Sequence, residues 1–297
     1  MGEIRRQEEE KRSAVAVSQA KQGQWTNWEG VEQRRVTWRD IWNMDGKRLS
    51  FLVRAAYDVL PTPKNLHQWM GEDPCCTLCG LPANLRHILC GCKVSLTQGR
   101  YTWRHNQVLR QLACALEERR LAANTHPSQR TRTLSVAFVS AGEQPKRAQS
   151  RQTVSSLDIA SDWEMRVDLD RMLVVPVEIV RTSLRPDIIL WSYSQKSCYI
   201  IELTVPWEGA VEEAYERKKS KYAEIAAQAR SNGWRVEVLP VEVGCRGFVA
   251  RTTTGLLKKM GVTGASYRKV VRSVADAAER SSNWIWIRRK QEIWARA

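Results

Sequence analysis

"RPDIILWSYSQKSCYIIELTV", residues 185–205, contains two acidic residues in apolar runs that have the composition of β-strands. Burying a carboxylate costs free energy unless it is paired or binds a cation, so Asp187 and Glu202 need a positive partner. Residues 188–201, fourteen in all, separate the two acids. Two neighbouring strands would bring the carboxylates together, where they could hold a hard divalent cation such as Mg²⁺ or Mn²⁺.

The segments around this stretch predict a sheet covered by helices. Strand-like runs occur at 174–180, 186–193, 198–205 and 234–243. Helical patterns occur at 101–123, 155–171, 209–231 and 267–282. From the helix expected at 155–171 onward, the order of elements is αβββαβα. Strands that are continuously apolar are typical of a sheet with both faces buried, so we expect an α/β fold.

The helix expected at 209–231 offers the acids a positive partner. Each residue of a helix advances by about 100° around the axis, which places Lys218 in the middle of the apolar stripe and Lys221 at its edge. A lysine that faces the sheet needs a partner, and the two carboxylates would supply one. The alternative is that these side chains extend along the apolar surface to solvent.

A cluster of cysteines at residues 75–92, CCTLCGLPANLRHILCGC, has the composition of a zinc site. Closely spaced thiolates and one imidazole favour tetrahedral Zn²⁺, and four protein ligands make the metal structural. The expected ligands are Cys76, Cys79, His87 and Cys92. Two other registers stay open, because Cys75 could replace Cys76 and Cys90 could replace Cys92.

The charge of the chain favours a polyanionic partner. Its 297 residues include 47 Lys and Arg against 32 Asp and Glu, a formal net charge of +15, which indicates nucleic acid before an anionic membrane surface. No apolar run approaches the length of a membrane span, and no signal peptide is evident, so we expect an intracellular protein with no membrane partner. We divide the chain into a helical region 1–70, a zinc-knuckle region 71–123, a linker 124–156 and a main domain 157–297.

Together these motifs resemble the C-terminal part of non-LTR retrotransposon proteins, of the class that carries a restriction-like endonuclease. The resemblance rests on the knuckle, on GRYTWRHNQVL at 99–109, and on the block 185–222. In that block Pro186-Asp187 and Glu202 match the PD-(D/E)xK nuclease motif. Thr204 occupies the position of the motif's lysine, so lysines of the following helix would replace it.

The resemblance implies a restriction-endonuclease-like core and a site for DNA cleavage. Mg²⁺ or Mn²⁺ would bind Asp187, Glu202 and the main-chain carbonyl of Leu203, and Lys218 and Lys221 would serve catalysis. The residues expected to contact nucleic acid are Arg104, His105 and Arg185. The resemblance also implies element RNA as a partner and a reverse transcriptase domain in a longer protein. A DNA substrate would place the protein in the nucleus, and otherwise we expect a cytoplasmic location. No polymerase motif such as Tyr-x-Asp-Asp occurs in these residues.

Two other functions fit parts of the sequence. The knuckle, the helix at 101–123 and the basic surface could bind RNA or DNA while the nuclease fold is inactive. Alternatively, the basic, tryptophan-rich tail NWIWIRRKQEIWARA at 283–297 could bind a partner protein, although such a tail is more often a packed terminal helix. Loss of cleavage with retained binding would favour the first of these alternatives.

Overall fold

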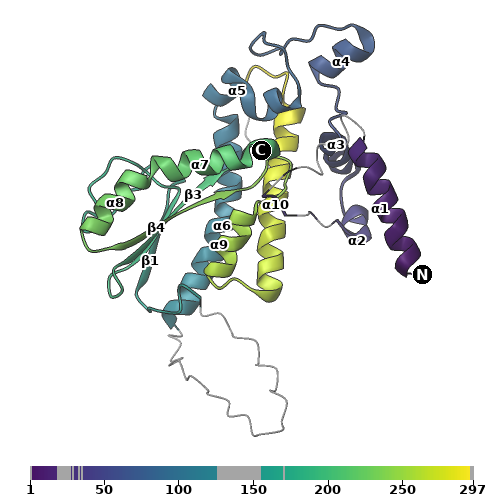
Figure 1. Cartoon of the computed structure of the whole chain (residues 1–297). Coiled ribbons are helices and arrows are strands. Elements are labelled where there is room, and N and C mark those ends of the chain that lie inside the picture. Colours follow the sequence, from purple (N-terminus) through teal and green to yellow (C-terminus); the bar gives the residue numbers. More distant parts are fainter. Residues whose placement is uncertain are drawn as a thin grey trace, which may run out of the picture.

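The protein is described here from a computed structural model, which covers residues 2–18, 28, 30–32, 34, 36–125, 155–169 and 171–294. It has a mixed α/β architecture with one four-stranded sheet (Figure 1). The strands are β1 (Trp163–Val167), β2 (Ile188–Ser192), β3 (Ser197–Thr204) and β4 (Arg235–Glu242). Nearly all of the linker expected at 124–156 lies outside the described residues.

The sheet has the simple order β1-β2-β3-β4, with two antiparallel pairs and one parallel pair. A tight turn joins β2 to β3, and Lys196 in this turn has a φ of 44°. Between β3 and β4 the chain forms α7 (Val211–Lys221) and α8 (Ala223–Ser231), which carry it back so that β4 runs parallel to β3. The single helix expected at 209–231 is therefore two helices, which meet at Tyr222.

The first strand is not where the sequence pattern predicts it. The run at 174–180 forms turns instead of a strand, and its Val174 and Val177 are exposed to solvent. Pro176 has no N–H to offer a strand ladder, and its carbonyl accepts a turn hydrogen bond from Ile179 N at 3.0 Å. The strand lies instead within the helix expected at 155–171, so both expectations were wrong.

Helices cover both faces of the sheet (Figure 1). The buried residues of one face, which include Ile188 and Leu190, pack with those of α6 (Arg100–Thr125), α9 (Arg251–Lys259) and α10 (Gly264–Ile287). The other face, which includes Ile189 and Trp191, packs with α8. From α6 onward the helices and strands follow the order αβββααβαα, so α6 stands before the strands in place of the helix predicted at 155–171.

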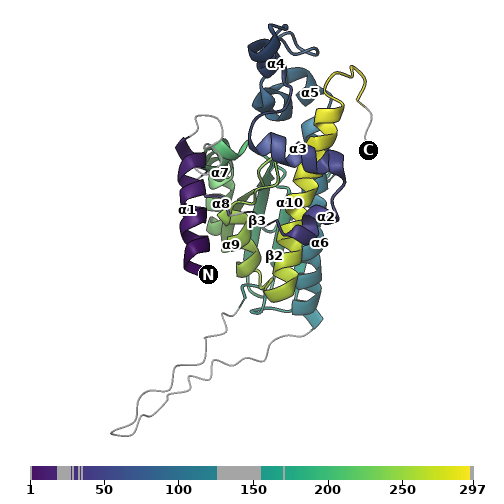
Figure 2. The ribbon, with the colours of Figure 1, turned by 90° about the vertical axis from the view of Figure 1, so that its right-hand side faces the viewer.

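The remaining helices precede α6. They are α1 (Gly2–Ser18), α2 (Trp38–Trp42), α3 (Gly46–Ala56), α4 (Pro63–Met70) and α5 (Lys93–Thr97). Figure 2 shows α6 and α10 side by side, with α2 and α3 against α10 and with α4 and α5 at the upper end. The aspartate Asp45 caps α3 and Thr62 caps α4, each by accepting backbone N–H bonds of the first helical turn.

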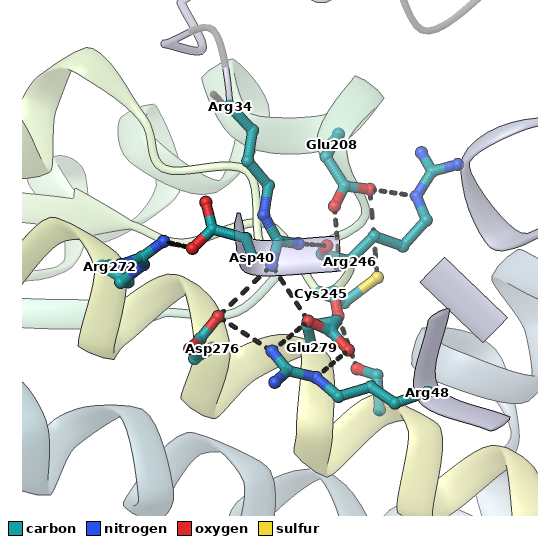
Figure 3. A network of polar contacts seen from close by, with 10 residues as sticks. Arg34, Asp40, Arg48, Glu208, Cys245, Arg246, Arg272, Asp276 and Glu279 are labelled. Carbon is teal, nitrogen blue, oxygen red and sulfur yellow. Dashed lines mark hydrogen bonds and ion pairs between the residues drawn. The ribbon is translucent and has the colours of Figure 1, made fainter. Parts of the chain in front are cut away.

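A network of ion pairs fastens the N-terminal region to the core (Figure 3). Arg34 and Arg48 both bind Asp276 and Glu279 of α10, and the side chain of Glu279 is fully buried. Nearby, the buried pair Arg246–Glu208 has an N–O distance of 2.7 Å. Buried charges that are each paired in this way hold elements distant in the sequence in one arrangement.

Candidate active site and metal centre

The two acids that the sequence singled out lie side by side. Ile188 pairs with Ile201 in the antiparallel register, so Asp187 falls next to Glu202 at the end of the β2–β3 ladder. The backbone N–H of Asp187 donates to Glu202 Oε2 at 3.1 Å, and that of Leu203 donates to Asp187 Oδ2 at 2.7 Å. Each strand thus satisfies an oxygen of the acid on the other strand.

The positive partner of Glu202 comes from α7, as the helical periodicity predicts. Lys218 Nζ lies 2.5 Å from Glu202 Oε1, and Lys221 Nζ lies 3.4 Å from the same oxygen. The Glu202 side chain is only 3% exposed, so this pairing is what permits a carboxylate to be buried there. Both lysines therefore lie at the acidic site. The alternative, in which the side chain extends into solvent, does not apply to Lys218.

Tyr222 closes this group from the break between α7 and α8. Its hydroxyl accepts a hydrogen bond from Lys221 Nζ at 3.0 Å and donates one to the main-chain carbonyl of Arg185 at 2.9 Å. Burial, together with the negative charge of Glu202, raises the pKa of the phenol, so it stays protonated and can donate. Tyr222 thereby joins the helix lysines to the chain just before Asp187.

His105 of α6 reaches the same site from the opposite wall. Its Nε2 lies 3.2 Å from Asp187 Oδ2 and 3.2 Å from the carbonyl oxygen of Leu203. Burial alone would lower the pKa of this imidazole, but the bond to Asp187 and its negative charge outweigh burial and raise it. His105 was expected to contact nucleic acid, whereas the structure places it against the acids. The signal was present in the sequence, because His105 precedes Val108, Leu109 and Leu112 on the buried face of one helix.

A cleft of about 1040 Å³ opens onto this site. Residues of α6 and of the segment after the zinc knuckle line one side, and residues of α7 line the other. Asp187, Leu203, His105 and Lys218 all lie on its surface. Four exposed arginines also line it: Arg86, Arg110, Arg171 and Arg217. Acid ligands with basic side chains around them suit a phosphodiester substrate, since the arginines can bind phosphates on either side of the reacting one.

The guanidinium of Arg104 is hydrogen-bonded within the protein. The residue is 2% exposed, and its guanidinium donates to the carbonyl of Leu89 at 2.9 Å, to Ser282 Oγ at 3.0 Å and to the carbonyl of Val205 at 3.1 Å. Arg104 lines the cleft, but its guanidinium is bonded to these three acceptors, so the expected contact with nucleic acid stays a prediction. Arg104 thereby joins the zinc-knuckle segment, α10 and the end of β3.

Arg185 is exposed beside the acids, and its guanidinium donates to the carbonyl of Arg171. It remains free to contact a phosphate on its outer side. Thr204, which stands in the motif's lysine position, pairs in the sheet with Glu242 of β4, and its hydroxyl has no partner among the residues described. No lysine in the described chain occupies that strand position, so the helix lysines are the cations of the site.

The cysteine cluster forms the second candidate metal centre. One possible ligand atom from each of Cys76, Cys79, His87 and Cys92 lies within 4.8 Å of the other three. Cys79 Sγ and His87 Nε2 are 3.3 Å apart. The turn that carries Cys76 and Cys79 ends at Gly80, whose φ of 71° suits glycine and whose N–H donates to the carbonyl of Cys76 at 2.9 Å. This Cys₃His set fits structural Zn²⁺ in tetrahedral coordination.

The structure decides between the registers that the sequence left open. Cys75 faces Asp73, which accepts its backbone N–H at 3.0 Å, and a bond to the same carboxylate raises the pKa of the thiol. Cys90 faces Arg104 at 3.8 Å and Cys245. Neither is a member of the converging group, so Cys76 and Cys92 are the candidate ligands.

The acidic site offers fewer converging side chains than the knuckle. Within the described part of the chain, the Cys₃His set is the only group of three or more His, Cys, Asp and Glu that converges as in a metal site. Both oxygens of Glu202 are occupied, by Lys218 and by the N–H of Asp187. Asp187 Oδ1 has no hydrogen bond to any described residue, so it is available to a cation. Two carboxylates and a carbonyl oxygen are nevertheless the donors that hard divalent cations take, so the residues fit such an ion chemically.

Comparison with models of known protein families finds none that matches this chain, and no curated protein matches it either. A search of the described helices for one long and apolar enough to cross a membrane also finds none.

Proposed function

We propose that the chain is a metal-dependent DNA endonuclease with a restriction-like core, derived from a non-LTR retrotransposon protein. The observation that carries the proposal is that Asp187 and Lys218 lie on a cleft lined by arginines and that the buried Glu202 is bonded to both of them. These residues come from two adjacent strands and a helix, and they match the acids of the PD-(D/E)xK motif with the lysine transferred to α7. The three-strand, helix, strand order of the sheet agrees with such a core.

In the proposed reaction the chain's own residues bind and orient the phosphate. Asp187, Glu202 and the Leu203 carbonyl would hold Mg²⁺ or Mn²⁺, and a bound divalent cation polarises a phosphodiester and lowers the pKa of a nearby water. Lys218 lies close enough to the acids to orient or deprotonate the attacking water, or to offset charge on the phosphate oxygens. Lys221, 40% exposed, supports Lys218 in this role.

The zinc knuckle has a structural part in this proposal. Its last ligand, Cys92, donates its backbone N–H to the hydroxyl of Tyr101, which lies near the beginning of α6. Four residues along the same helix, His105 contacts Asp187. A folded knuckle therefore sets the position of the helix that forms one side of the cleft. Element RNA and a polymerase domain belong to the same proposal, because they follow from the family resemblance, and a nuclear location follows from the DNA substrate.

A nicking assay on supercoiled plasmid tests the proposal. Purified protein with Mg²⁺ or Mn²⁺ should convert the plasmid to the open circle, and Asp187→Ala should abolish the conversion. Lys218→Ala should slow nicking by about 100-fold or more, the usual contribution of a general acid or base. Lys219→Ala is the matched control on the same helix, since Lys219 is 57% exposed and its described contacts are with Glu216 and the ring of Tyr215, away from the acids.

The competing function is binding of nucleic acid without cleavage. One observation favours it: both oxygens of Glu202 already have partners, Lys218 and the N–H of Asp187, in place of a metal ion. Binding of plasmid at low salt, with no nicking under any divalent cation, would overturn the nuclease proposal. Steep loss of binding with salt is expected in either case, because phosphate contacts release counterions. Nicking that survives in Asp187→Ala would show a contaminating nuclease.

A further inference from the structure

The orientation of His105 is fixed by its neighbour. Asn106 Nδ2 donates to the carbonyl of Leu169 at 3.0 Å, which leaves the Asn106 amide oxygen facing His105 Nδ1 at 3.2 Å. An amide oxygen can only accept, so Nδ1 carries the hydrogen. In a neutral imidazole the other nitrogen then has a bare lone pair. In that neutral form, Nε2 presents a lone pair toward the cleft.

That lone pair faces two further acceptors. Asp187 Oδ2 and the Leu203 carbonyl oxygen each lie 3.2 Å from Nε2, and neither can donate a proton when Asp187 is ionised. Three acceptor atoms at these separations repel one another unless a positive charge lies among them. The charge is either a second proton on the imidazole or a metal ion.

Separations of 3.2 Å are at the long end for N–H···O hydrogen bonds, and they also fit the second possibility. Adjacent ligands of an octahedral ion that sit 2.0–2.1 Å from it are about 3.0 Å apart. An imidazole nitrogen with a carboxylate and a carbonyl oxygen is a mixed donor set. Oxygen donors suit Mg²⁺, Ca²⁺ and Mn²⁺, and imidazole suits first-row transition metals such as iron and zinc. Of the three ions that prefer oxygen, only Mn²⁺ is a first-row transition metal.

We propose that His105 is a nitrogen ligand of the cleft cation, together with Asp187 and the Leu203 carbonyl, and that it makes the site selective for Mn²⁺ over Mg²⁺. The inference rests on the proposed function, since the cation is the one assigned to the nuclease site. It assigns His105 a direct role at the reacting centre and gives Asn106 a positioning role, because the Asn106 amide sets which imidazole nitrogen faces the metal.

Metal binding measured without DNA tests this inference. Zinc-loaded protein is titrated with Mn²⁺ and with Mg²⁺ by calorimetry, for the unaltered chain, His105→Ala and His105→Asn. Changes in second-shell partners alone weaken metal binding by about 10–100-fold, so loss of a direct ligand should weaken Mn²⁺ binding at least about tenfold. Mg²⁺ binding should change little. Electron spin echo spectra of bound Mn²⁺ should show nitrogen coupling in the unaltered protein and none in either variant.

His67→Ala is the control for the loss of a histidine, because His67 is exposed on α4 and its Nδ1 lies 2.7 Å from the carbonyl oxygen of Glu72, outside the cleft. Far-ultraviolet circular dichroism and one equivalent of bound zinc confirm that each variant is folded. Unchanged or tighter Mn²⁺ binding in both His105 variants would overturn the inference, since His105 would then be a protonated competitor of the metal. If Asp187→Ala also leaves binding unchanged, the proposed nuclease site itself fails.

Discussion

Replacing Arg104, whose guanidinium is buried, should make the protein unfold far more readily. The replacement should have no direct effect on the affinity for nucleic acid. Arg104→Met keeps a long unbranched stem and removes the charged group. The oxygen acceptors that it leaves are the carbonyls of Leu89 and Val205 and the hydroxyl of Ser282, at 2.9, 3.1 and 3.0 Å, and Cys90 Sγ loses a contact at 3.8 Å. Leu89 and Ser282 are fully buried, so water cannot replace the lost donor there, whereas the carbonyl of Val205 is at the cleft, where water can.

The magnitude follows from these contacts. Hydrogen bonds to a charged group contribute about 1.5–3 kcal/mol each, so three of them give roughly 4.5–9 kcal/mol before other terms are considered. The methionine variant buries no cation. Its folded state therefore avoids a desolvation cost of several kcal/mol, which offsets part of this loss. Leaving a neutral buried acceptor without its donor costs about 1–3 kcal/mol, so the two fully buried acceptors give a net loss of about 2–6 kcal/mol. For a chain of this size such a loss lowers the melting temperature by roughly 10 °C.

Urea unfolding followed by tryptophan fluorescence measures the effect. Arg110→Met is the matched control, because Arg110 is six residues further along the same helix and exposed. The control should unfold within about 0.5 kcal/mol of the unaltered protein. A loss in Arg104→Met no larger than that of the control would refute the assignment. So would a folded Arg104→Met variant whose stability is unchanged but whose affinity for DNA falls, because that result would restore Arg104 as a nucleic-acid contact.

Two further outcomes are expected. The purified protein should contain one zinc ion by elemental analysis, which Cys79→Ser should remove and Cys75→Ser should retain; equal loss from both would contradict the ligand assignment. Burial raises the pKa of Glu242 from 4.5 to about 7, and the folded state therefore holds a proton between those values that the unfolded state releases. Stability should fall by up to about 3 kcal/mol as pH rises through this window, and Glu242→Gln should remove that dependence, as pH-resolved urea unfolding would show. An identical slope in the variant would rule out Glu242 as its source.

Local patterns along the chain were sufficient to predict the acidic site. Two acids in apolar runs, separated by a short turn, have few arrangements other than a hairpin that places them together. Lys218 falls on the buried stripe of a helix by periodicity alone, and the structure places it 2.5 Å from Glu202. The α/β class was predicted for the same reason, because continuous apolar strands require helices on both sides.

Other features depend on contacts between residues far apart in the sequence. The run at 174–180 is as apolar as a strand, yet Pro176 prevents a ladder there, and the segment at 163–167 pairs with β2 in its place. Its alternation of buried and exposed residues extends over only five positions, too few to distinguish it from a helix. Which of the two segments becomes the first strand depends on which of them can pair with β2.

The two neighbours Arg104 and His105 show the same division between sequence and tertiary structure. Their side chains and their place after the zinc knuckle were evident from the chain alone, and both were interpreted as contacts to nucleic acid. Only the packing of α6 between α10 and the sheet decides that Arg104 is buried as a link between three segments and that His105 faces Asp187. A local pattern specifies which face of a helix a residue occupies, whereas the groups opposite that face come from residues about 80–180 positions away.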